Sequence, residues 1–131
     1  MVVVDASTVL ELLLARPAAS ALRKRLFDRV TPLHVPHLID VEVAHVIRRY
    51  ALLGELDAER AESAIAKHLA LPFERHSHDA LLGVVWQLRD NFTAYDAIYV
   101  ALGVALRATF ITADLRLARA AEALLPVEVF A

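Results

Sequence analysis

The 131-residue sequence contains no cysteine, which excludes disulfide bonds and thiolate metal sites. Its only glycines are Gly54, Gly83 and Gly103, so it lacks the glycine-rich loop that cradles nucleotide phosphates. No apolar stretch approaches the roughly 18 residues that a membrane-spanning helix requires. The first residues also lack the basic and long apolar regions of a secretory signal peptide. We therefore expect a cytoplasmic protein without a membrane association.

Positive charge is not in excess either, since the formal net charge at pH 7 is −2. Binding to nucleic acid would therefore need a local basic face or metal ions that bridge to phosphate. Hydrophobic residues make up 58% of the sequence, which argues against disorder and predicts one folded domain over residues 1–131. This fraction is above the usual range for a soluble domain, so we expect a partner to cover part of the surface.

Short apolar runs alternate with helix-length segments, which predicts an α/β fold with a parallel sheet. The expected strands are residues 2–4, 33–35, 71–74, 109–112 and 127–130, and the expected helices are about 8–14, 17–30, 38–53, 58–70, 81–86, 94–106 and 115–125. Residues that can cap the helices following them are Ser7, Asp57, Thr93 and Asp114. Helical spacing in the third helix predicts a core face of Ile39, Val43, Val46, Ile47, Tyr50 and Leu53.

The segment from Thr93 to Leu106 is hydrophobic on every side of a helix, a pattern typical of a buried helix. Asp96 is the only charged residue between Ala94 and Leu106. A buried carboxylate without a partner is costly, so either a local group or a cation must satisfy Asp96. The local alternative is a capping box, Thr93-x-x-Asp96.

Three further acids fall where a parallel sheet would bring them near Asp96. Asp5 ends the first strand, Asp114 follows the strand over 109–112, and Glu42 lies early in a helix of the same sense. Ligands of open parallel sheets bind beyond the carboxyl ends of the strands, so these four acids, the acidic quartet, can meet at one edge. Structural alternatives remain open: Asp5 and Asp114 as helix caps, and Glu42 as a partner of Arg49.

The chemistry of the acidic quartet favours a metal ion. Four close carboxylates repel one another, and a divalent cation removes this conflict. Ligands that are all oxygen suit Mg²⁺ or Mn²⁺ rather than zinc. Such ions bind phosphate, activate water and stabilise charge on a leaving oxygen, which fits hydrolysis of a phosphodiester.

Other chemistries have weaker support in the sequence. His76 and His78 could ligate zinc, but no third ligand is evident, so loop histidines without a metal are the favoured interpretation. The basic run over residues 23–25 is typical of a solvated helix face, with phosphate contact as the alternative. Trp86 and Phe92 are expected in the core or in an interface rather than stacked on bases.

Four blocks of the sequence carry a resemblance to a known family. They are MVVVDAS at residues 1–7, Glu42 in a helix after a proline, TAYDAIYVAL at residues 93–102, and ITAD at residues 111–114. Together they resemble a PIN domain, and YDAIYVAL in particular is similar to VapC-type toxins of bacterial toxin–antitoxin pairs. The resemblance covers essentially the whole chain. It implies a three-layer α/β/α fold with a central, mostly parallel sheet of about five strands.

The resemblance also carries over functional residues. The family's catalytic, metal-binding acids fall on Asp5, Glu42, Asp96 and Asp114, and none of the four is replaced. Asp5 and Asp96 would be the principal metal ligands. Asp114 would bind a metal directly or through water, and Glu42 would position a metal or the attacking water. The hydroxyls that match those supporting the quartet belong to Ser7 and Thr112.

The activity implied by the resemblance is that of an Mg²⁺- or Mn²⁺-dependent endoribonuclease, which hydrolyses RNA as the toxin of a toxin–antitoxin pair. A homodimer is also implied, able to form a larger assembly with the antitoxin. The antitoxin would inhibit through a C-terminal segment in the active-site groove. Two alternatives stay open at this stage: a non-catalytic protein-binding module whose acids are helix caps, and a PIN nuclease that acts on another nucleic acid.

Overall fold

The computed structural model describes residues 1–28 and 31–131, and its centre is a five-stranded sheet in which all paired strands are parallel. The strands are β1 (Val2–Val4), β2 (Leu33–Pro36), β3 (Phe73–His76), β4 (Thr109–Thr112) and β5 (Val127–Val129). Their order across the sheet is β3-β2-β1-β4-β5, so β1 is the central strand. The predicted α/β fold with a parallel sheet of about five strands is confirmed.

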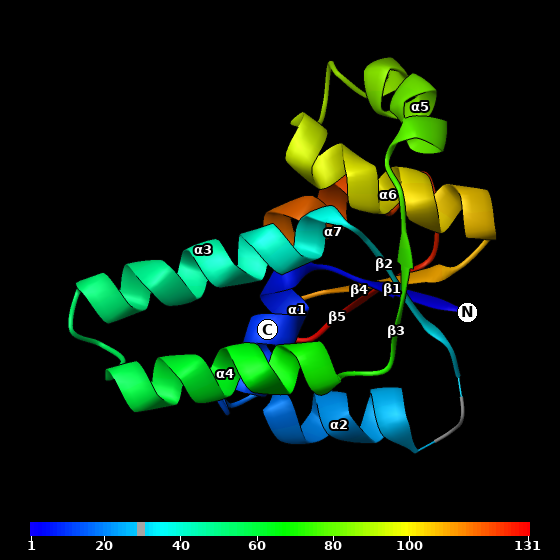
Figure 1. The fold of residues 1–131 in the computed structure, drawn as a ribbon. Helices are drawn as coiled ribbons and strands as arrows, with labels where there is room; N and C mark the ends of the chain where they lie inside the picture. The colour runs from blue at the N-terminus through cyan, green and yellow to red at the C-terminus, as the bar shows by residue number, and fades with distance from the viewer. Residues whose placement is uncertain (29–30) are drawn as a thin grey trace.

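Helices cover both faces of this sheet (Figure 1). One face carries α1 (Ala6–Leu13), α2 (Ala19–Phe27), α3 (Leu38–Leu52) and α4 (Ala58–Ala70). The other carries the 3₁₀ turn η1 (Asp79–Leu81), α5 (Leu82–Gln87), α6 (Ala94–Leu106) and α7 (Leu115–Ala121). Right-handed crossovers require this division, because the chain runs outward from β1 to β3 and then back to β4 and β5. No helix in the described ranges is long and apolar enough to cross a membrane.

The deepest helix is α6, where seven consecutive residues from Ala97 to Gly103 are buried. This burial is what its hydrophobic pattern predicts. A side chain at Gly103 would place its Cβ 2.5 Å from Leu125 Cδ1, so a larger residue there would force Leu125 to move. Glycine at this position therefore lets α6 lie close to the segment that leads into β5.

Four helices begin at a side chain that accepts a hydrogen bond from a backbone N–H of the first turn, and the capping residues are Asp5, Asp57, Thr93 and Asp114. The last three caps are confirmed predictions. The prediction that Ser7 caps the first helix is wrong. Asp5 already accepts the Thr8 N–H, and the helix therefore begins one residue before Ser7.

The second helix is shorter than expected. α2 begins at Ala19, so Pro17 precedes the first turn instead of lying within it. The last helical residue is Phe27, and Asp28 caps the end. The expected continuation to Val30 lies outside the described residues.

The core face of α3 agrees with the helical spacing except at its end. The fully buried residues of this helix are Ile39, Val43 and Ile47, while Val46 and Tyr50 are partly buried against the core. Leu53 follows the last helical residue and is 66% exposed, so its assignment to the core is wrong.

Two later boundaries differ because of proline. β3 begins at Phe73 rather than at Leu71, since the intervening Pro72 has no N–H to donate to a neighbouring strand. α7 ends at Ala121 rather than near Leu125. Pro126 disfavours a helical backbone at Leu125, so the helix cannot include that residue.

Candidate metal-binding active site

The direction of the chain across the sheet reverses between β1 and β4. From β1 the chain continues toward β2, and from β4 it continues toward β5 on the other side. Open α/β sheets bind ligands at this switch point, beyond the carboxyl ends of the strands. Asp5 immediately follows β1, and Asp114 lies two residues beyond the end of β4. The sheet order therefore brings both residues to the same rim.

Asp5 is 5% exposed and is held by three hydrogen bonds. Its Oδ1 accepts from the Thr8 N–H at 3.0 Å and from Ser7 Oγ at 2.7 Å. Its Oδ2 accepts from Thr112 Oγ1 at 2.6 Å. Burial raises the pKa of Asp5, and these hydrogen bonds oppose the rise without cancelling it. Asp5 thus caps α1, but the bond to the Thr8 N–H uses only one of its two oxygens.

Ser7 and Thr112 connect Asp5 to the loop that carries Asp114. Ser7 Oγ accepts a hydrogen bond from the Ala113 N–H at 3.0 Å, and Thr112 Oγ1 accepts one from the Asp114 N–H at 3.0 Å. Both hydroxyls also donate to the Asp5 carboxylate. Asp5 and Thr112 are 107 residues apart in the chain, so these two hydroxyls fix the relative position of distant segments.

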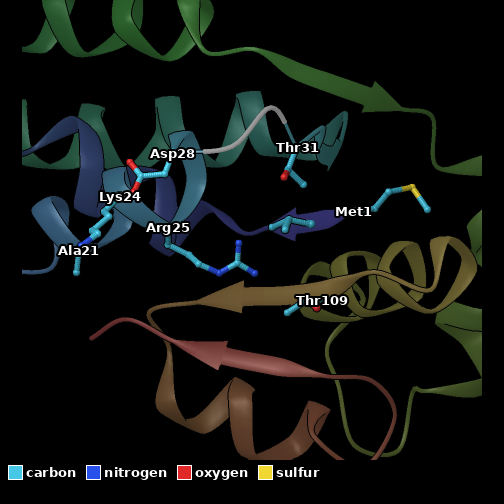
Figure 2. A pocket seen from close by; sticks show the side chains of 8 residues that line it. Met1, Ala21, Lys24, Arg25, Asp28, Thr31 and Thr109 are labelled. Carbon is cyan, nitrogen blue, oxygen red and sulfur yellow. The ribbon is translucent and has the colours of Figure 1, made fainter.

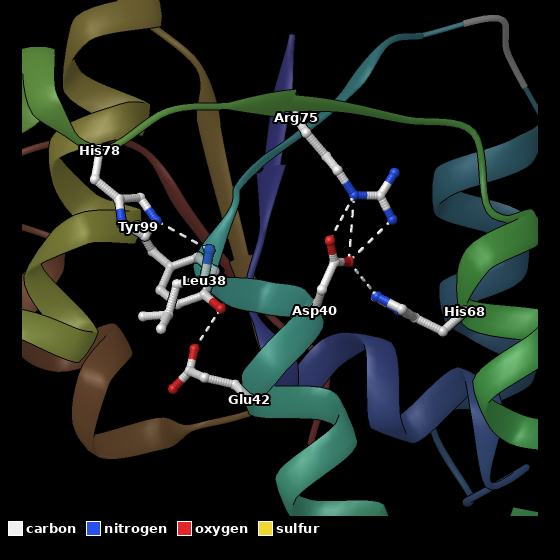
Figure 3. A network of polar contacts seen from close by, with 7 residues as sticks. All are labelled: Leu38, Asp40, Glu42, His68, Arg75, His78 and Tyr99. Atoms are coloured by element: carbon white, nitrogen blue, oxygen red, sulfur yellow. Dashed lines mark hydrogen bonds and ion pairs between the residues drawn. The ribbon is translucent and has the colours of Figure 1, made fainter.

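Glu42 lies near the start of α3 and contacts α6 (Figure 3). One of its carboxylate oxygens accepts a hydrogen bond from the Tyr99 hydroxyl. Burial raises the pKa of Glu42, and the negative charges of Asp5 and Asp96 raise it further, against the opposing effect of the Tyr99 bond. Glu42 therefore lies within electrostatic reach of both aspartates. Within the described residues Arg49 forms no ion pair with Glu42, so that alternative is wrong.

Asp96 is in the first turn of α6 and is half-buried. Its N–H donates to Thr93 Oγ1 at 3.1 Å, but the return bond of a capping box, from the Thr93 N–H, is not found in the described chain. The carboxylate lies 3.7 Å from the guanidinium of Arg116, a side chain that is 83% exposed. Burial and the charge of Asp114 raise the pKa of Asp96, so the solvated arginine compensates it only in part.

The acidic quartet thus gathers at one end of the sheet. Burial raises the pKa of three members, Asp5, Glu42 and Asp96, and repulsion from neighbouring carboxylates raises it further at Glu42 and Asp96. Negative charge that the protein leaves uncompensated is the condition that a bound cation relieves. All four side chains offer carboxylate oxygens, the ligands preferred by Mg²⁺ and Mn²⁺. The residues present therefore fit a hard divalent metal ion.

A groove of about 540 Å³ opens beside the acidic quartet and is called the α1–α3 groove here. Ser7 and Glu42 line it, together with the apolar side chains of Leu10, Leu38, Val41 and Val46. Tyr95, from the first turn of α6, is also part of the wall and is 65% exposed. The groove therefore joins an apolar surface to two polar groups of the site.

Two residues of the basic run, Lys24 and Arg25, lie on α2 and do not line the α1–α3 groove. Lys24 and Arg25 line a hollow of about 700 Å³ beside Met1 and Thr109, at the amino ends of β1 and β4 (Figure 2). Arg25 donates hydrogen bonds of 2.7 and 3.0 Å to the Glu128 carboxylate, which raise the pKa of Arg25. Because the acidic quartet lies at the carboxyl ends of the strands, these cations belong to a different surface.

The aromatic and histidine predictions have mixed outcomes. Phe92 is buried in the core as expected, whereas Trp86 is exposed on α5 with the Arg89 guanidinium 4.8 Å from its ring centroid. His78 accepts a hydrogen bond from the Leu38 N–H at 2.9 Å (Figure 3). His76 instead contacts residues of β2 and β3, so the two histidines do not share a ligand position.

Tyr99 is the residue of this site that the sequence analysis does not identify. Tyr99 lies in a helical segment whose sequence is almost entirely apolar, so its hydroxyl gives no sign of a polar role. The ring is almost fully buried in the structure. The available signal is its spacing, because a residue three positions after Asp96 lies on the same face of the helix. The spacing therefore predicts that the Tyr99 hydroxyl lies on the same side of α6 as the Asp96 carboxylate.

Comparisons with known proteins agree with this architecture. Residues 2–123 match the family model of the PIN domain. The chain is 42% identical over 123 residues to ribonuclease VapC1 of Mycobacterium tuberculosis, covering 90% of this chain and 89% of that protein. It is 40% identical over 133 residues to ribonuclease VapC9 of the same organism, covering 98% of each.

The fold also matches a solved structure. A chain in the crystal structure of VapBC2 from Rickettsia felis, bound to a DNA fragment from their promoter, has a TM-score of 0.74 at 14% identity. The match covers 100% of both chains and supports the three-layer fold. Together with the two sequence relatives, the family match shows that the protein belongs to the PIN-domain family, among the VapC ribonucleases.

Proposed function

We propose that this protein is a metal-dependent endoribonuclease that acts as the toxin of a toxin–antitoxin pair. The observation that carries the proposal is the acidic quartet, four carboxylates gathered at the switch point of the sheet with incomplete charge compensation. Membership of the VapC ribonucleases supports RNA as the substrate class. Because RNA is the substrate, we expect the protein to act in the cytoplasm.

Mg²⁺ or Mn²⁺ is the proposed cofactor. PIN-domain nucleases generally use divalent metal ions, and the quartet offers oxygen ligands only. Asp5 and Asp96 would be the principal ligands, with Asp114 binding directly or through water. When bound, the ion supplies positive charge that activates water and stabilises the leaving oxygen.

The chain's own side chains have separate roles in this proposal. Ser7 and Thr112 hold Asp5 in one orientation through their hydroxyls. Glu42 is the proton acceptor in this proposal. Its pKa is raised toward neutral pH, and a general base works best when its pKa is near the pH of the reaction. Water attacks the phosphorus, Glu42 accepts its proton, the bond from phosphorus to the leaving oxygen breaks, and that oxygen takes up a proton from solvent. Tyr99 orients Glu42 by donating to its carboxylate.

The α1–α3 groove is the proposed site for a C-terminal segment of the antitoxin. Its apolar wall suits the apolar side chains of an incoming peptide, and exposed Val41 and Tyr95 would be covered on binding. Ser7 and Glu42 at the groove bring the peptide next to the acidic quartet, where a basic side chain would be attracted. An antitoxin held there would block access of RNA to the acids.

A homodimer is the proposed assembly of the toxin, and it would join a larger complex with the antitoxin. Leu82 and Trp86 lie one helical turn apart on α5 and are 55% and 68% exposed, so they supply an apolar surface for a second copy. Light scattering of the purified protein tests this. A dimer that becomes monomeric on Trp86→Ala supports α5 as the interface, and an unchanged mass excludes it.

The activity is tested by incubating purified protein with labelled RNA and labelled DNA, each with Mg²⁺, with Mn²⁺ and with EDTA. We expect cleavage of RNA that requires metal and stops in EDTA. Cleavage of DNA alone would support a PIN nuclease with another substrate. Cleavage of neither, by protein that stays folded without metal, would support the binding-module alternative.

Inhibition by an antitoxin is tested with the protein encoded by a small open reading frame directly upstream of this gene, if there is one. Adding that protein, or only its C-terminal segment, should abolish cleavage of RNA. Val41→Asp, which places a charge on the groove wall, should weaken inhibition while the uninhibited protein still cuts. Equal inhibition of both proteins would argue against the α1–α3 groove as the binding surface.

A further inference from the structure

Three metal-ligating side chains converge on β2 and β3, away from the acidic quartet. His34 Nδ1 lies 2.9 Å from His76 Nε2 and 3.7 Å from Glu74 Oε2. One ligand atom from each residue lies within 4.8 Å of the other two. We propose that this cluster, the β2–β3 histidine site, binds a zinc-class transition-metal ion, distinct from the ion of the acidic quartet.

The register of the sheet brings these ligands together. His34 pairs with Glu74 across the two parallel strands, and His76 lies two positions further along β3. Alternate residues of a strand share a face, so all three ligands share one face. Arg75 takes the opposite face, where it binds Asp40 of α3 (Figure 3). The cluster therefore lies on the face covered by α5 and α6.

The surroundings of His34 suit a metal ligand. The ring is 4% exposed. Its Nε2 is buried without a hydrogen-bond partner in the described ranges. The polar contacts of this ring are made by Nδ1, which lies near His76 Nε2 and Glu74 Oε2.

The spacing of the ligand atoms is close to what zinc needs. Tetrahedral zinc with bonds of about 2.0–2.2 Å separates its ligand atoms by roughly 3.4 Å. The two observed separations, 2.9 and 3.7 Å, lie on either side of that value. The Glu74 side chain is 63% exposed and has room to close on an ion. Two imidazoles and one carboxylate form a known zinc set with one position left open.

The location gives the site a physical role. β3 is an edge strand, and its only neighbour in the described sheet is β2. An ion that bridges the two strands would tie this edge to the sheet and limit its exposure as an unpaired edge. Binding to the folded state alone would raise the unfolding temperature, and the rise would grow with the logarithm of the ion concentration once that exceeds the dissociation constant.

The test uses the full chain with Asp5→Asn and Asp96→Asn, so that the acidic quartet does not compete for metal. Zn²⁺ is titrated by calorimetry, and Co²⁺ is followed by its visible absorption, which reports nitrogen ligation. We expect one ion per chain and a rise in unfolding temperature with Zn²⁺. His76→Gln and Glu74→Gln are added in this background, with His37→Gln as the control because that histidine is exposed and outside the cluster.

His76→Gln should weaken Zn²⁺ binding by more than the roughly 10–100-fold that is lost when a residue that only hydrogen-bonds to a metal ligand is removed. His37→Gln should bind as the parent does. Glu74→Gln should also weaken Zn²⁺ binding. Because Glu74 is exposed, this variant should fold even if His76→Gln does not, so the test stays valid. Absence of saturable binding at one equivalent, or equal affinity in the Glu74→Gln and His37→Gln proteins, would overturn the proposal.

Discussion

Two carboxylates of α3, only two residues apart, have opposite electrostatic environments (Figure 3). Burial opposes the ionisation of Asp40, but hydrogen bonds from Arg75 at 2.9 Å and His68 at 2.7 Å outweigh it and lower its pKa. Glu42 has only a neutral donor, Tyr99, and its pKa is raised by burial. A carboxylate balanced by protein cations serves structure, whereas one left unbalanced is available to a ligand.

Among the carboxylates whose charge the protein does not balance, Asp96 should give the largest effect on RNA cleavage when it is changed to Asn. The substitution keeps the shape of the side chain but removes the charge that a cation would meet. We expect single-turnover cleavage of RNA in Mg²⁺ to fall by at least about 10²–10³-fold, the loss typical of removing a preorganised electrostatic contact. Circular dichroism should show an intact fold. Near-wild-type turnover would defeat the assignment of Asp96.

Tyr99→Phe should have a smaller effect, because it leaves every acid in place and removes only the hydrogen bond to Glu42. Hydrogen bonds to charged groups contribute about 1.5–3 kcal/mol, so a loss of roughly 10- to 150-fold in cleavage rate is expected. Tyr95→Phe is the matched control, since that residue is exposed on the same helix. Equal rates for the two variants would remove Tyr99 from the site.

The pH dependence of stability tests the charge balance directly. In EDTA, the free energy of unfolding should rise as the pH falls from 7 toward 5. Asp5, Glu42 and Asp96 have folded pKa values above their unfolded values, so the native state binds more protons in that range. Asp40 acts in the opposite direction, and only near or below its unfolded value of about 4.

Urea unfolding at several pH values measures this change. The control neutralises the three acids, Asp5→Asn, Glu42→Gln and Asp96→Asn, and keeps every histidine that titrates in the same range. The control should lack the added gain on acidification. Parallel curves for the two proteins would show that the acids do not repel one another in the native state.

Asp40→Asn should have the smallest effect of these variants on RNA cleavage, because Asp40 is balanced by protein groups and Glu42 is not. Its side chain is 39% exposed, so loss of the charge should cost about 1 kcal/mol or less in the free energy of unfolding. Asparagine keeps an oxygen that can accept from Arg75 and His68. Cleavage of RNA should stay at the wild-type rate. A rate loss as large as that of Asp96→Asn would end the distinction between the two kinds of carboxylate.

Much of the fold follows from local sequence. Val2-Val3-Val4 predicts the central strand, and the all-round apolar pattern of residues 94–106 predicts the buried helix. The caps at Asp57, Thr93 and Asp114 follow from side-chain chemistry at the starts of helices. Each of these features depends on neighbours within a few residues, which the sequence displays directly.

The remaining features depend on which strands are adjacent. At the start of α1, Asp5 and Ser7 both can cap, and the contacts of Thr112 and Ala113 with Ser7 decide between them. The bond between Tyr99 and Glu42 joins residues 57 positions apart. The cluster of the β2–β3 histidine site requires the register of those two strands. Local spacing alone does not contain this information.

The central position of β1 has a consequence for how the protein is made. β1 is synthesised before the other four strands, yet one of its two neighbours, β4, is synthesised only after β2 and β3. A nascent chain that stops before residue 109 therefore lacks the partners of Asp5 in β4 and lacks Asp114 altogether. Long-range pairing of this kind also forms late in folding. The acidic quartet is therefore complete only after β4 and Asp114 have been added to a chain that already contains Asp5 and Glu42.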